Sequence, residues 1–311
     1  MMAAADGKVM PLHREIAVDR IAFGLLAAIV VVWGANWPVM KIGLAHMQPL
    51  WFAALRLSLG VLCFAVVLVP RRRLRLPSRA DLPVVVSVGL LQMAVFMAVV
   101  NTALQWVPPG RSAILAYTTP LWVAPGAALF LGERLTRARL AGIGLGLAGV
   151  AVLFNPLGFD WHNRTALAGN GLLLAAALIW AAAIVHVRGH RWQAPPLELA
   201  PWQMAIGLLP LILLAWAVEG PPRADTSPQF LAVVAYNGPL STAFAYWAAV
   251  SVNRMLPAVT VSLSFLCVPV VGLLASSLTF GEPLTATNLG GLALILAGVA
   301  VVALSPSAGK A

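Results

Sequence analysis

The stretch GERLTRARLAGIGLGLAGVAV, at residues 132–152, occurs a second time in the chain as GEPLTATNLGGLALILAGVAV, at residues 281–301. The two copies lie 149 residues apart and are identical at 13 of 21 positions without a gap. Apolar helices match often by chance, but a shared Gly-Glu-x-Leu-Thr turn does not. The same offset pairs Pro120 with Pro269. We infer that the chain arose by internal duplication.

The composition is that of a membrane protein. Of the 311 residues, 61% are hydrophobic and only 10% are charged, and the mean hydropathy is +0.90. Soluble proteins carry about 25% charged residues. Ten apolar runs of about 20 residues are each long enough to cross a bilayer as a helix. The expected spans are 21–44, 50–69, 82–105, 111–131, 138–155, 168–187, 199–217, 229–250, 258–280 and 286–304.

Two copies of five spans account for all ten. Because five is an odd number, the second copy must enter the membrane from the opposite side. The predicted fold class is therefore all-α: a polytopic membrane protein with ten transmembrane helices in two inverted five-helix repeats. The expected domains are a cytoplasmic N-terminal tail (1–20), the first repeat (21–155), an external connecting loop (156–167), the second repeat (168–304) and a cytoplasmic C-terminal tail (305–311).

The basic residues support this orientation. With the N-terminus in the cytoplasm, 15 lysines and arginines fall inside and 4 fall outside, while Arg56 lies within the second span. This bias follows the positive-inside rule. The duplicated turn shows it directly, since it reads GERLTRAR inside and GEPLTATN outside.

Other function classes find little support. The net charge of +10 does not indicate nucleic-acid binding, because the basic residues occupy short loops between apolar runs. All ten acids map to tails, loops or helix ends, and the five histidines show no metal-binding spacing. A membrane-embedded enzyme therefore lacks a catalytic constellation, and no metal or cofactor is predicted. A channel would need a ring of acids or a filter-like loop.

Inverted repeats suit transport, because two pseudo-symmetric halves can rock around a site near the membrane midplane. A duplication that merely enlarges a membrane scaffold is the alternative. Carriers driven by protons or sodium ions commonly keep a carboxylate in the bundle, and no span contains one. We therefore expect movement down the substrate's own gradient, or coupling without a membrane carboxylate.

A candidate site begins in the first span. On a helix, Trp33, Asn36, Trp37 and Met40 share one face, and Pro38 removes a backbone donor between them. An amide facing lipid would be unsatisfied, so we expect this stripe to face the bundle and to line a cavity. Simple helix packing is the alternative.

Further polar and aromatic residues lie at membrane depth in other spans. On a regular helix Gln92 and Asn101 are about 180° apart, so both would not face one pocket, whereas Asn237 and Ser241 share a face at i, i+4. The remaining candidate binding residues are Tyr117, Thr118, Trp180, Tyr236, Tyr246 and Ser264.

Prolines and glycines suggest how the spans pack and bend. Pro38, Pro120, Pro239 and Pro269 are candidate hinges, because each removes a backbone hydrogen bond, and packing kinks are the alternative. Glycines repeat along the fifth and tenth spans. Small residues allow close helix contact, so we expect the fifth and tenth spans to form either a scaffold within one chain or a contact between two chains. The expected oligomeric state is a monomer or a homodimer.

A neutral cavity of indoles, phenols, amides and hydroxyls suits a small zwitterion or an amphipathic metabolite. The amides would hold its polar head and the aromatic faces its side chain. Cationic drugs could bind the same rings through cation–π contacts.

Three motifs resemble the EamA type of the drug/metabolite transporter superfamily. They are WGANWPVMKIG (33–43) followed by Pro49 and Arg56, LIWAAAIVHVRGHR (178–191), and the pair GERLT and GEPLT. The resemblance covers residues 21–304. It implies a carrier of the bacterial-type inner membrane with both termini cytoplasmic and a central cavity walled mainly by helices 1, 3, 4, 6, 8 and 9.

The resemblance also implies export of amino acids and related metabolites. The aromatic residues make the chain similar to aromatic amino acid exporters within the family. Export of lipophilic or cationic drugs on the same fold is the alternative. The partners expected are a small-molecule substrate and membrane lipids, with no nucleic acid. Arg56 matches a recurrent arginine of the family's second helix, for which we expect a structural role, with recognition of the substrate as the alternative.

Overall fold

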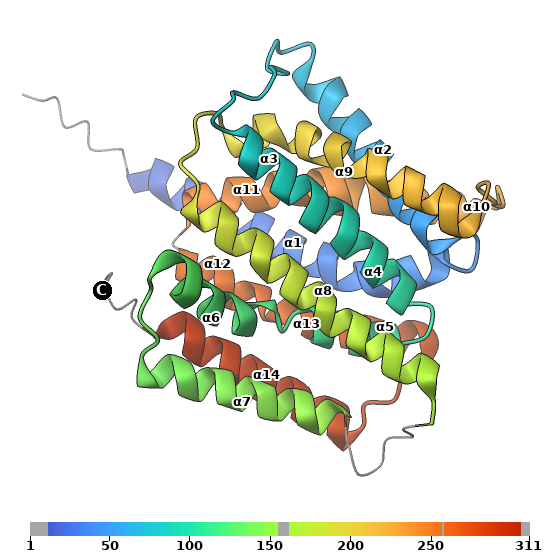
Figure 1. The fold of residues 1–311 in the computed structure, drawn as a ribbon. Helices are drawn as coiled ribbons and strands as arrows, with labels where there is room; N and C mark the ends of the chain where they lie inside the picture. Colours follow the sequence, from blue (N-terminus) through green and yellow to red (C-terminus); the bar gives the residue numbers. More distant parts are fainter. Residues whose placement is uncertain (1–11, 155–161, 257, 306–311) are drawn as a thin grey trace, which may run out of the picture.

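The computed structural model describes residues 12–154, 162–256 and 258–305. These residues form ten helical segments, four of them interrupted, in one bundle (Figure 1). In the first half the segments are α1 (Leu12–Gly43), α2 (Pro49–Leu68), α3–η1–α4 (Leu82–Ser87, Val88–Val95, Phe96–Ala103), α5–α6 (Pro109–Ala116, Thr119–Leu131) and α7 (Arg137–Phe154). In the second half they are α8 (Arg164–Gly189), α9 (Pro196–Glu219), α10–η2–α11 (Pro228–Ala235, Tyr236–Phe244, Ala245–Met255), α12–α13 (Ala258–Phe265, Cys267–Phe280) and α14 (Ala286–Leu304).

These segments agree with the ten expected spans. Eight of them are long and apolar enough to cross a membrane, and α7 and α10–η2–α11 complete the set. Helix α1 begins at Leu12, within the tail expected at 1–20. Of the tails and the connecting loop expected at 1–20, 156–167 and 305–311, residues 1–11, 156–161 and 306–311 lie outside the described part of the chain.

The interruptions recur at the repeat offset of 149 residues. Both third segments contain a π-helix, η1 in the first half and η2 in the second, and both fourth segments break just before a proline, Pro120 and Pro269. Proline has no backbone N–H to donate to the preceding turn of a helix, and the missing hydrogen bond favours a break in the helix. The duplication read from the sequence is therefore present in the irregular parts of the fold as well.

The duplicated Gly-Glu turns end α6 and α13 in the same way. Gly132 and Gly281 have φ of 69° and 67°, the left-handed conformation in which a glycine closes a helix at little steric cost. After Gly132, the Glu133 carboxylate binds Arg188 at 2.7 Å and Arg139 at 3.1 Å. Arg188 lies in the last turn of α8.

The second turn lies at the opposite end of α8. Glu282 accepts the backbone N–H groups of Gly110 at 2.8 Å and Arg111 at 3.0 Å, and the Arg111 side chain donates to Asn170 Oδ1 at 2.8 Å. Asn170 is the seventh residue of α8, and Arg188 is 18 residues further along this helix. A helix rises 1.5 Å per residue, so the two turns are about 27 Å apart along α8, close to the thickness of a bilayer core. The two repeats are inverted with respect to each other.

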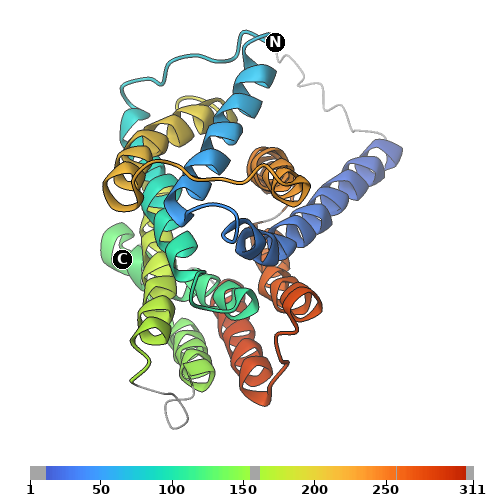
Figure 2. The ribbon, with the colours of Figure 1, turned by 90° about the vertical axis from the view of Figure 1, so that its right-hand side faces the viewer.

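Helices α7 and α14 lie side by side at one edge of the bundle (Figures 1 and 2). Glycines allow the close approach: a Cβ on Gly149 would lie 2.8 Å from the carbonyl oxygen of Gly291, and a Cβ on Gly298 would lie 2.5 Å from the backbone nitrogen of Gly146. The expected close packing of the fifth and tenth spans is confirmed.

This contact predicts a position-specific effect of added methyl groups. Alanine at Gly298 would press on backbone atoms of α7 that cannot move aside, so we expect Gly298→Ala to lower the free energy of unfolding by about 1–3 kcal/mol. At Gly290 the nearest atom to the added Cβ is 3.9 Å away, and Gly290→Ala should be neutral or stabilising by up to about 1 kcal/mol. Thermal unfolding in detergent measures both variants. Equal losses would contradict the packing described.

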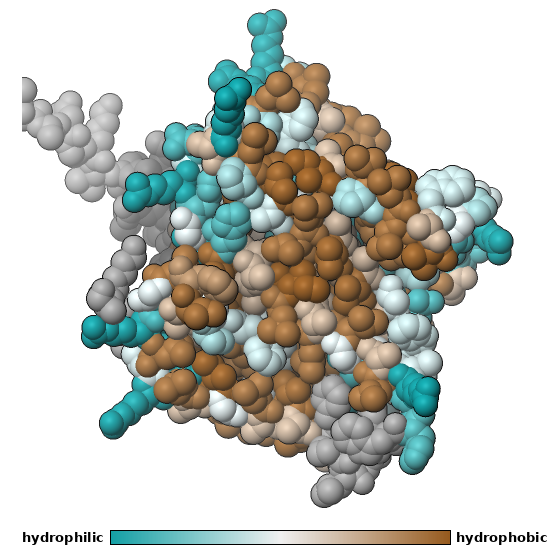
Figure 3. Space-filling model, in the orientation of Figure 1, coloured by the Kyte–Doolittle hydropathy of each residue, from teal (hydrophilic) through white to brown (hydrophobic). Residues whose placement is uncertain are grey.

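The face of the bundle seen in Figure 3 is largely apolar between its polar ends. Large aliphatic side chains are exposed on the outside of the bundle, such as Leu278 at 89%, Leu129 at 77% and Val66 at 64%. A soluble monomer rarely exposes a continuous apolar surface of this kind. The surface therefore suits lipid.

Candidate functional site

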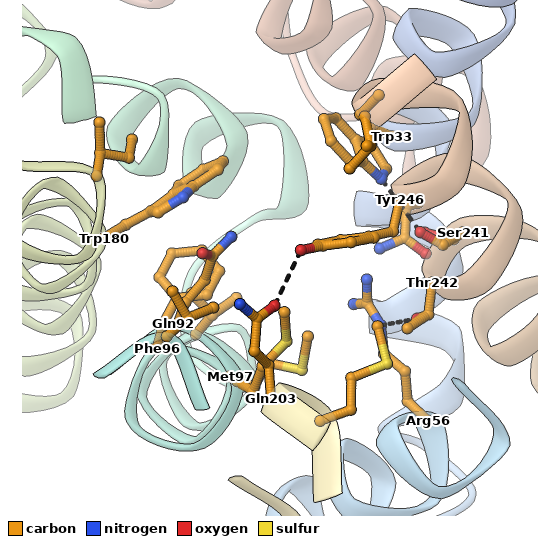
Figure 4. Close-up of a pocket in the computed structure, with 18 of the residues that line it drawn as sticks. Trp33, Arg56, Gln92, Phe96, Met97, Trp180, Gln203, Ser241, Thr242 and Tyr246 are labelled. Carbon is orange, nitrogen blue, oxygen red and sulfur yellow. Dashed lines mark hydrogen bonds between the residues drawn. The ribbon is translucent and has the colours of Figure 1, made fainter. Parts of the chain in front are cut away.

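A cavity of about 590 Å³ lies inside the bundle, between elements of both halves (Figure 4). Its walls are rich in aromatic and sulfur-containing side chains, with a smaller number of polar groups. The aromatic lining residues are Trp33, Trp37, Phe96, Tyr117, Trp180, Trp192, Tyr246 and Phe265. The polar ones are Asn36, Arg56, Gln92, Asn101, Gln203, Ser241, Thr242, Asn253 and Arg254.

The predicted stripe on α1 faces this cavity. Trp33, Asn36, Trp37 and Met40 all line it, as the helical spacing indicates. The Trp33 indole donates to the backbone carbonyl of Ser241 at 3.1 Å, which ties α1 to η2. Because a side chain of the first repeat donates a hydrogen bond to the backbone of the second, the stripe lies at the interface between the two repeats.

Gln92 and Asn101 both line the cavity, although a regular helix would place them on opposite faces. The reason is the π-helix η1, which contains Gln92 and ends six residues before Asn101. A π-helix needs about one more residue per turn than an α-helix. The extra residue brings the two side chains toward one face, so the expectation from a regular helix is wrong here.

Trp180 of α8 forms an aromatic wall with residues of the first half. Its ring centroid lies 5.1 Å from that of Phe96 and 5.9 Å from that of Tyr117, the latter pair edge to face. Opposite this wall, the Tyr246 hydroxyl donates to Gln203 Oε1 at 3.0 Å (Figure 4). These contacts hold large, rigid rings around the cavity and leave their faces available for an apolar group.

Four of the predicted binding residues do not line this cavity. Thr118 and Ser264 donate their hydroxyl groups to carbonyls of their own helical segments, at 2.7 and 2.9 Å. Tyr236 donates to the carbonyl of Val32 at 2.7 Å. Asn237 is buried elsewhere, because positions i and i+4 do not align in a π-helix, so it does not share the face of Ser241.

The four candidate hinge prolines occupy different settings. Pro38 is buried inside an unbroken α1, and Pro239 is exposed within η2. Pro120 and Pro269 open the second pieces of the broken fourth and ninth spans. The carbonyl freed by Pro120 is bound by the Thr119 hydroxyl at 2.8 Å, so it is already satisfied without substrate. A hinge role for these prolines stays a prediction.

Three polar atoms at the cavity wall have no hydrogen-bond partner among the described residues. They are Asn36 Oδ1, Asn101 Oδ1 and Ser241 Oγ, on side chains that are at most 4% exposed. Buried polar atoms are nearly always paired, because an unpaired one costs free energy. All three belong to residues that line the cavity. They therefore suit a ligand, or ordered water in its absence.

Several lining residues are missing from the sequence prediction. Arg56 and Thr242 line the cavity from α2 and η2, and Gln203 lines it from α9, so the second and seventh spans join the six that the resemblance implied. Arg56 could have been found from its charge, since it lies further inside its expected span than Lys41, Arg111 or Arg139 do. Gln203 could have been found as an amide in an otherwise apolar run.

The cavity extends to exposed residues at one end of the bundle. Asn253 and Arg254, in the last turn of α11, are exposed and line it. At the other end, the Lys41 ammonium group donates to the carbonyl oxygens of Leu104 at 2.6 Å and Gln105 at 2.8 Å, joining the C-terminal ends of α1 and α4. The open end is the end at which Glu133 and Arg188 meet.

A model of the EamA-like transporter family matches residues 20–155 and again residues 167–304. The chain belongs to the EamA-like transporter family. The matched segments together cover most of its length, and each corresponds to one copy of the duplicated unit. The transporter is therefore not an enzyme, and the resemblance seen in the motifs is confirmed.

Relatives agree with this assignment over nearly the full length. A probable amino-acid metabolite efflux pump of Salmonella typhimurium is 32% identical over 290 residues, covering 89% of this chain and 93% of the relative. An uncharacterized inner membrane transporter of Escherichia coli, YedA, is 30% identical and covers 91% and 90% of the two chains. A crystal structure with 25% identity superposes with a TM-score of 0.63 over 91% of this transporter and 96% of that chain.

Proposed function

We propose that this transporter exports amino acids and related small metabolites, which bind in the central cavity during alternating access. The observation that carries the proposal is the set of unpaired atoms on Asn36, Asn101 and Ser241 inside an aromatic cavity. Apolar walls with a few placed polar groups are typical of small-molecule sites. The volume of about 590 Å³ lies within the usual range of about 300–1,000 Å³ for such sites.

The relatives favour the same substrate class. One of them is named a probable amino-acid metabolite efflux pump. An amino acid with an apolar side chain would match both parts of the lining: the unpaired acceptors would take its ammonium group, and rings such as Trp180 and Phe96 would contact its side chain.

The arginine-rich end of the bundle defines the proposed orientation. Basic loops mark the cytoplasmic side, and Arg134, Arg188 and Arg254 lie at the end where the cavity is open. Both termini would then be cytoplasmic in an inner membrane, and the structure would be an inward-facing state. A solute would enter the cavity from the cytoplasm, as an exporter requires.

The repeats at 21–155 and 168–304 would move against each other during transport. The two repeats meet at contacts such as that of Trp33 with the Ser241 carbonyl, and the hydrogen bonds of Lys41 would form a latch that keeps the opposite end closed. Opening this latch while closing the arginine-rich end would expose the same residues to the other side of the membrane.

Reconstituted protein tests the proposal. Proteoliposomes loaded with unlabelled phenylalanine should accumulate labelled phenylalanine by exchange, above the level of protein-free liposomes, and the assay should be run with and without a proton gradient. No movement of any amino acid, together with movement of a lipophilic cation, would refute amino-acid export. That result would instead favour the drug-exporting alternative, which the aromatic lining could serve through cation–π contacts.

A further inference from the structure

We propose that Arg56 is the receptor for a substrate carboxylate, so that this transporter selects carboxylate-bearing solutes over their neutral or cationic analogues. The inference rests on the proposed function and names the group that sets its specificity. It assigns Arg56 the substrate-recognising role instead of the structural one expected from the sequence.

The Arg56 guanidinium group is fixed at one edge. Its Nε donates to Thr242 Oγ1 at 2.6 Å, and the Thr242 hydroxyl in turn donates to the carbonyl of Asn237 at 2.7 Å. Its Nη1 lies 3.2 Å from Met40 Sδ, a weak acceptor. A guanidinium group carries five N–H donors, and these two contacts leave several of them directed to the cavity (Figure 4).

Among the described residues, no carboxylate at the cavity wall balances this charge. None of the residues that line the cavity is an aspartate or a glutamate. Four acids of the described chain are held elsewhere: Asp81 binds the loop before α9, Glu133 binds two arginines, Glu219 caps the start of α2, and Glu282 caps the start of α5. A fifth, Glu198, lies in the first turn of α9 and does not line the cavity.

A cation buried at membrane depth without a counter-ion is costly, and such residues mark substrate pathways. The planar fork of a guanidinium group matches the two oxygens of a carboxylate. A bound carboxylate would therefore supply the missing counter-charge. A cationic drug would add a second positive charge beside Arg56, which disfavours the drug-exporting alternative.

The acceptors that an α-ammonium group needs lie nearby. Asn36 and Met40 are one turn apart on α1, and Met40 contacts the guanidinium group. Residues at i and i+4 lie about 5–6 Å apart, so the unpaired Asn36 Oδ1 is one turn from the Arg56 site. A donor fork beside a free acceptor complements a group that carries a carboxylate and an ammonium on the same carbon.

The test compares binding of three ligands to purified transporter, using the fluorescence of the cavity tryptophans. Phenylalanine has both charges, phenylalaninamide lacks the carboxylate, and 3-phenylpropionate lacks the ammonium group. We expect phenylalanine to bind about 10- to 100-fold more tightly than phenylalaninamide, because the amide loses the charge-assisted contact with Arg56. In Arg56→Gln this ratio should fall to about threefold or less, and Arg56→Lys should restore part of it.

The control is Arg134→Gln, which removes an exposed arginine on the turn after α6 and should keep the native ratio. If Arg56→Gln weakens both ligands equally, the residue is structural and the proposal is wrong. If the native protein binds phenylalanine and phenylalaninamide equally, the proposal is also wrong, whether or not the variants fold. If the native protein binds none of the three ligands, the proposed function fails and this proposal fails with it.

Discussion

Replacing Asn36 by leucine is expected to slow amino-acid exchange about 10- to 100-fold without lowering the stability of the protein. Asn36 is 4% exposed, and its Oδ1 has no partner in the described structure. Removing an unpaired buried acceptor should leave the free energy of unfolding unchanged or raise it. The same atom is proposed to accept a substrate N–H group, so activity should be lost. Exchange in proteoliposomes and thermal unfolding in detergent measure the two effects.

Asn170 provides a matched control for this variant. It is 3% exposed, but its Oδ1 accepts Arg111 Nε at 2.8 Å and its Nδ2 donates to a carbonyl of α8 at 2.7 Å. Asn170→Leu should therefore reduce stability by about 1–3 kcal/mol, because it breaks satisfied hydrogen bonds, and should leave phenylalanine affinity unchanged. If Asn36→Leu instead behaves like Asn170→Leu, the unpaired amide does not belong to the site.

Removing the Asp81 carboxylate is expected to destabilise the arginine-rich end of the bundle by about 3 kcal/mol. Asp81 is fully buried, and its two oxygens accept the backbone N–H groups of Gln193 and Ala194, each at 3.0 Å, with further bonds at 3.0 Å from His190 and Ser78. It thus fastens the loop before α9 to the start of α3. Thermal unfolding of Asp81→Ala measures the loss, and Asp225→Ala, which removes an exposed carboxylate, should lose much less.

The same contacts predict how this contribution depends on pH. Burial by itself raises the pKa of Asp81, but the hydrogen bonds from Gln193, His190, Ser78 and Ala194 outweigh it and hold the pKa at about 2, below its usual 3.8. A carboxyl group whose pKa is lowered by folding stabilises the folded state above its unfolded pKa. The difference in melting temperature between the native chain and Asp81→Asn should therefore be full near pH 7 and shrink as the pH falls from about 4 toward about 2. A difference that grows on acidification would contradict this sign.

Regular parts of the fold follow directly from the sequence. The ten spans follow from their length and hydropathy, and the inversion follows from the odd number of spans in each copy. The α1 stripe of Trp33, Asn36 and Trp37 was predictable because α1 runs unbroken through Pro38, so a 3.6-residue period holds along it.

The irregular helices explain most of what the sequence could not predict. Nothing in VGLLQMAV marks a π-helix, yet η1 decides that Gln92 and Asn101 face one cavity. The π-helix η2 likewise separates Asn237 from Ser241. Hydrogen bonds of this kind depend on the helices packed alongside, and a helical period read from one segment does not contain that information.

Arg56 was visible in the sequence but its surroundings were not. A charged residue within a span can be a functional residue or part of a structural ion pair, and only its neighbours distinguish the two. The structure shows Thr242 and Met40 beside it, from spans eight and one, and no acid at the cavity wall. Only tertiary contacts between distant spans reveal that the charge lacks a fixed counter-ion.

The central claim is that two inverted repeats enclose one substrate cavity, and labelling with a membrane-impermeant thiol reagent tests it most directly. Arg134 and Pro283 occupy equivalent, exposed positions on the two duplicated turns. Each is replaced by cysteine in a chain whose own Cys63 and Cys267 have been removed. In everted membrane vesicles the cysteine at 134 should react and the cysteine at 283 should not, with the reverse result in intact spheroplasts. Reaction of both positions from the same side of the membrane would contradict the account.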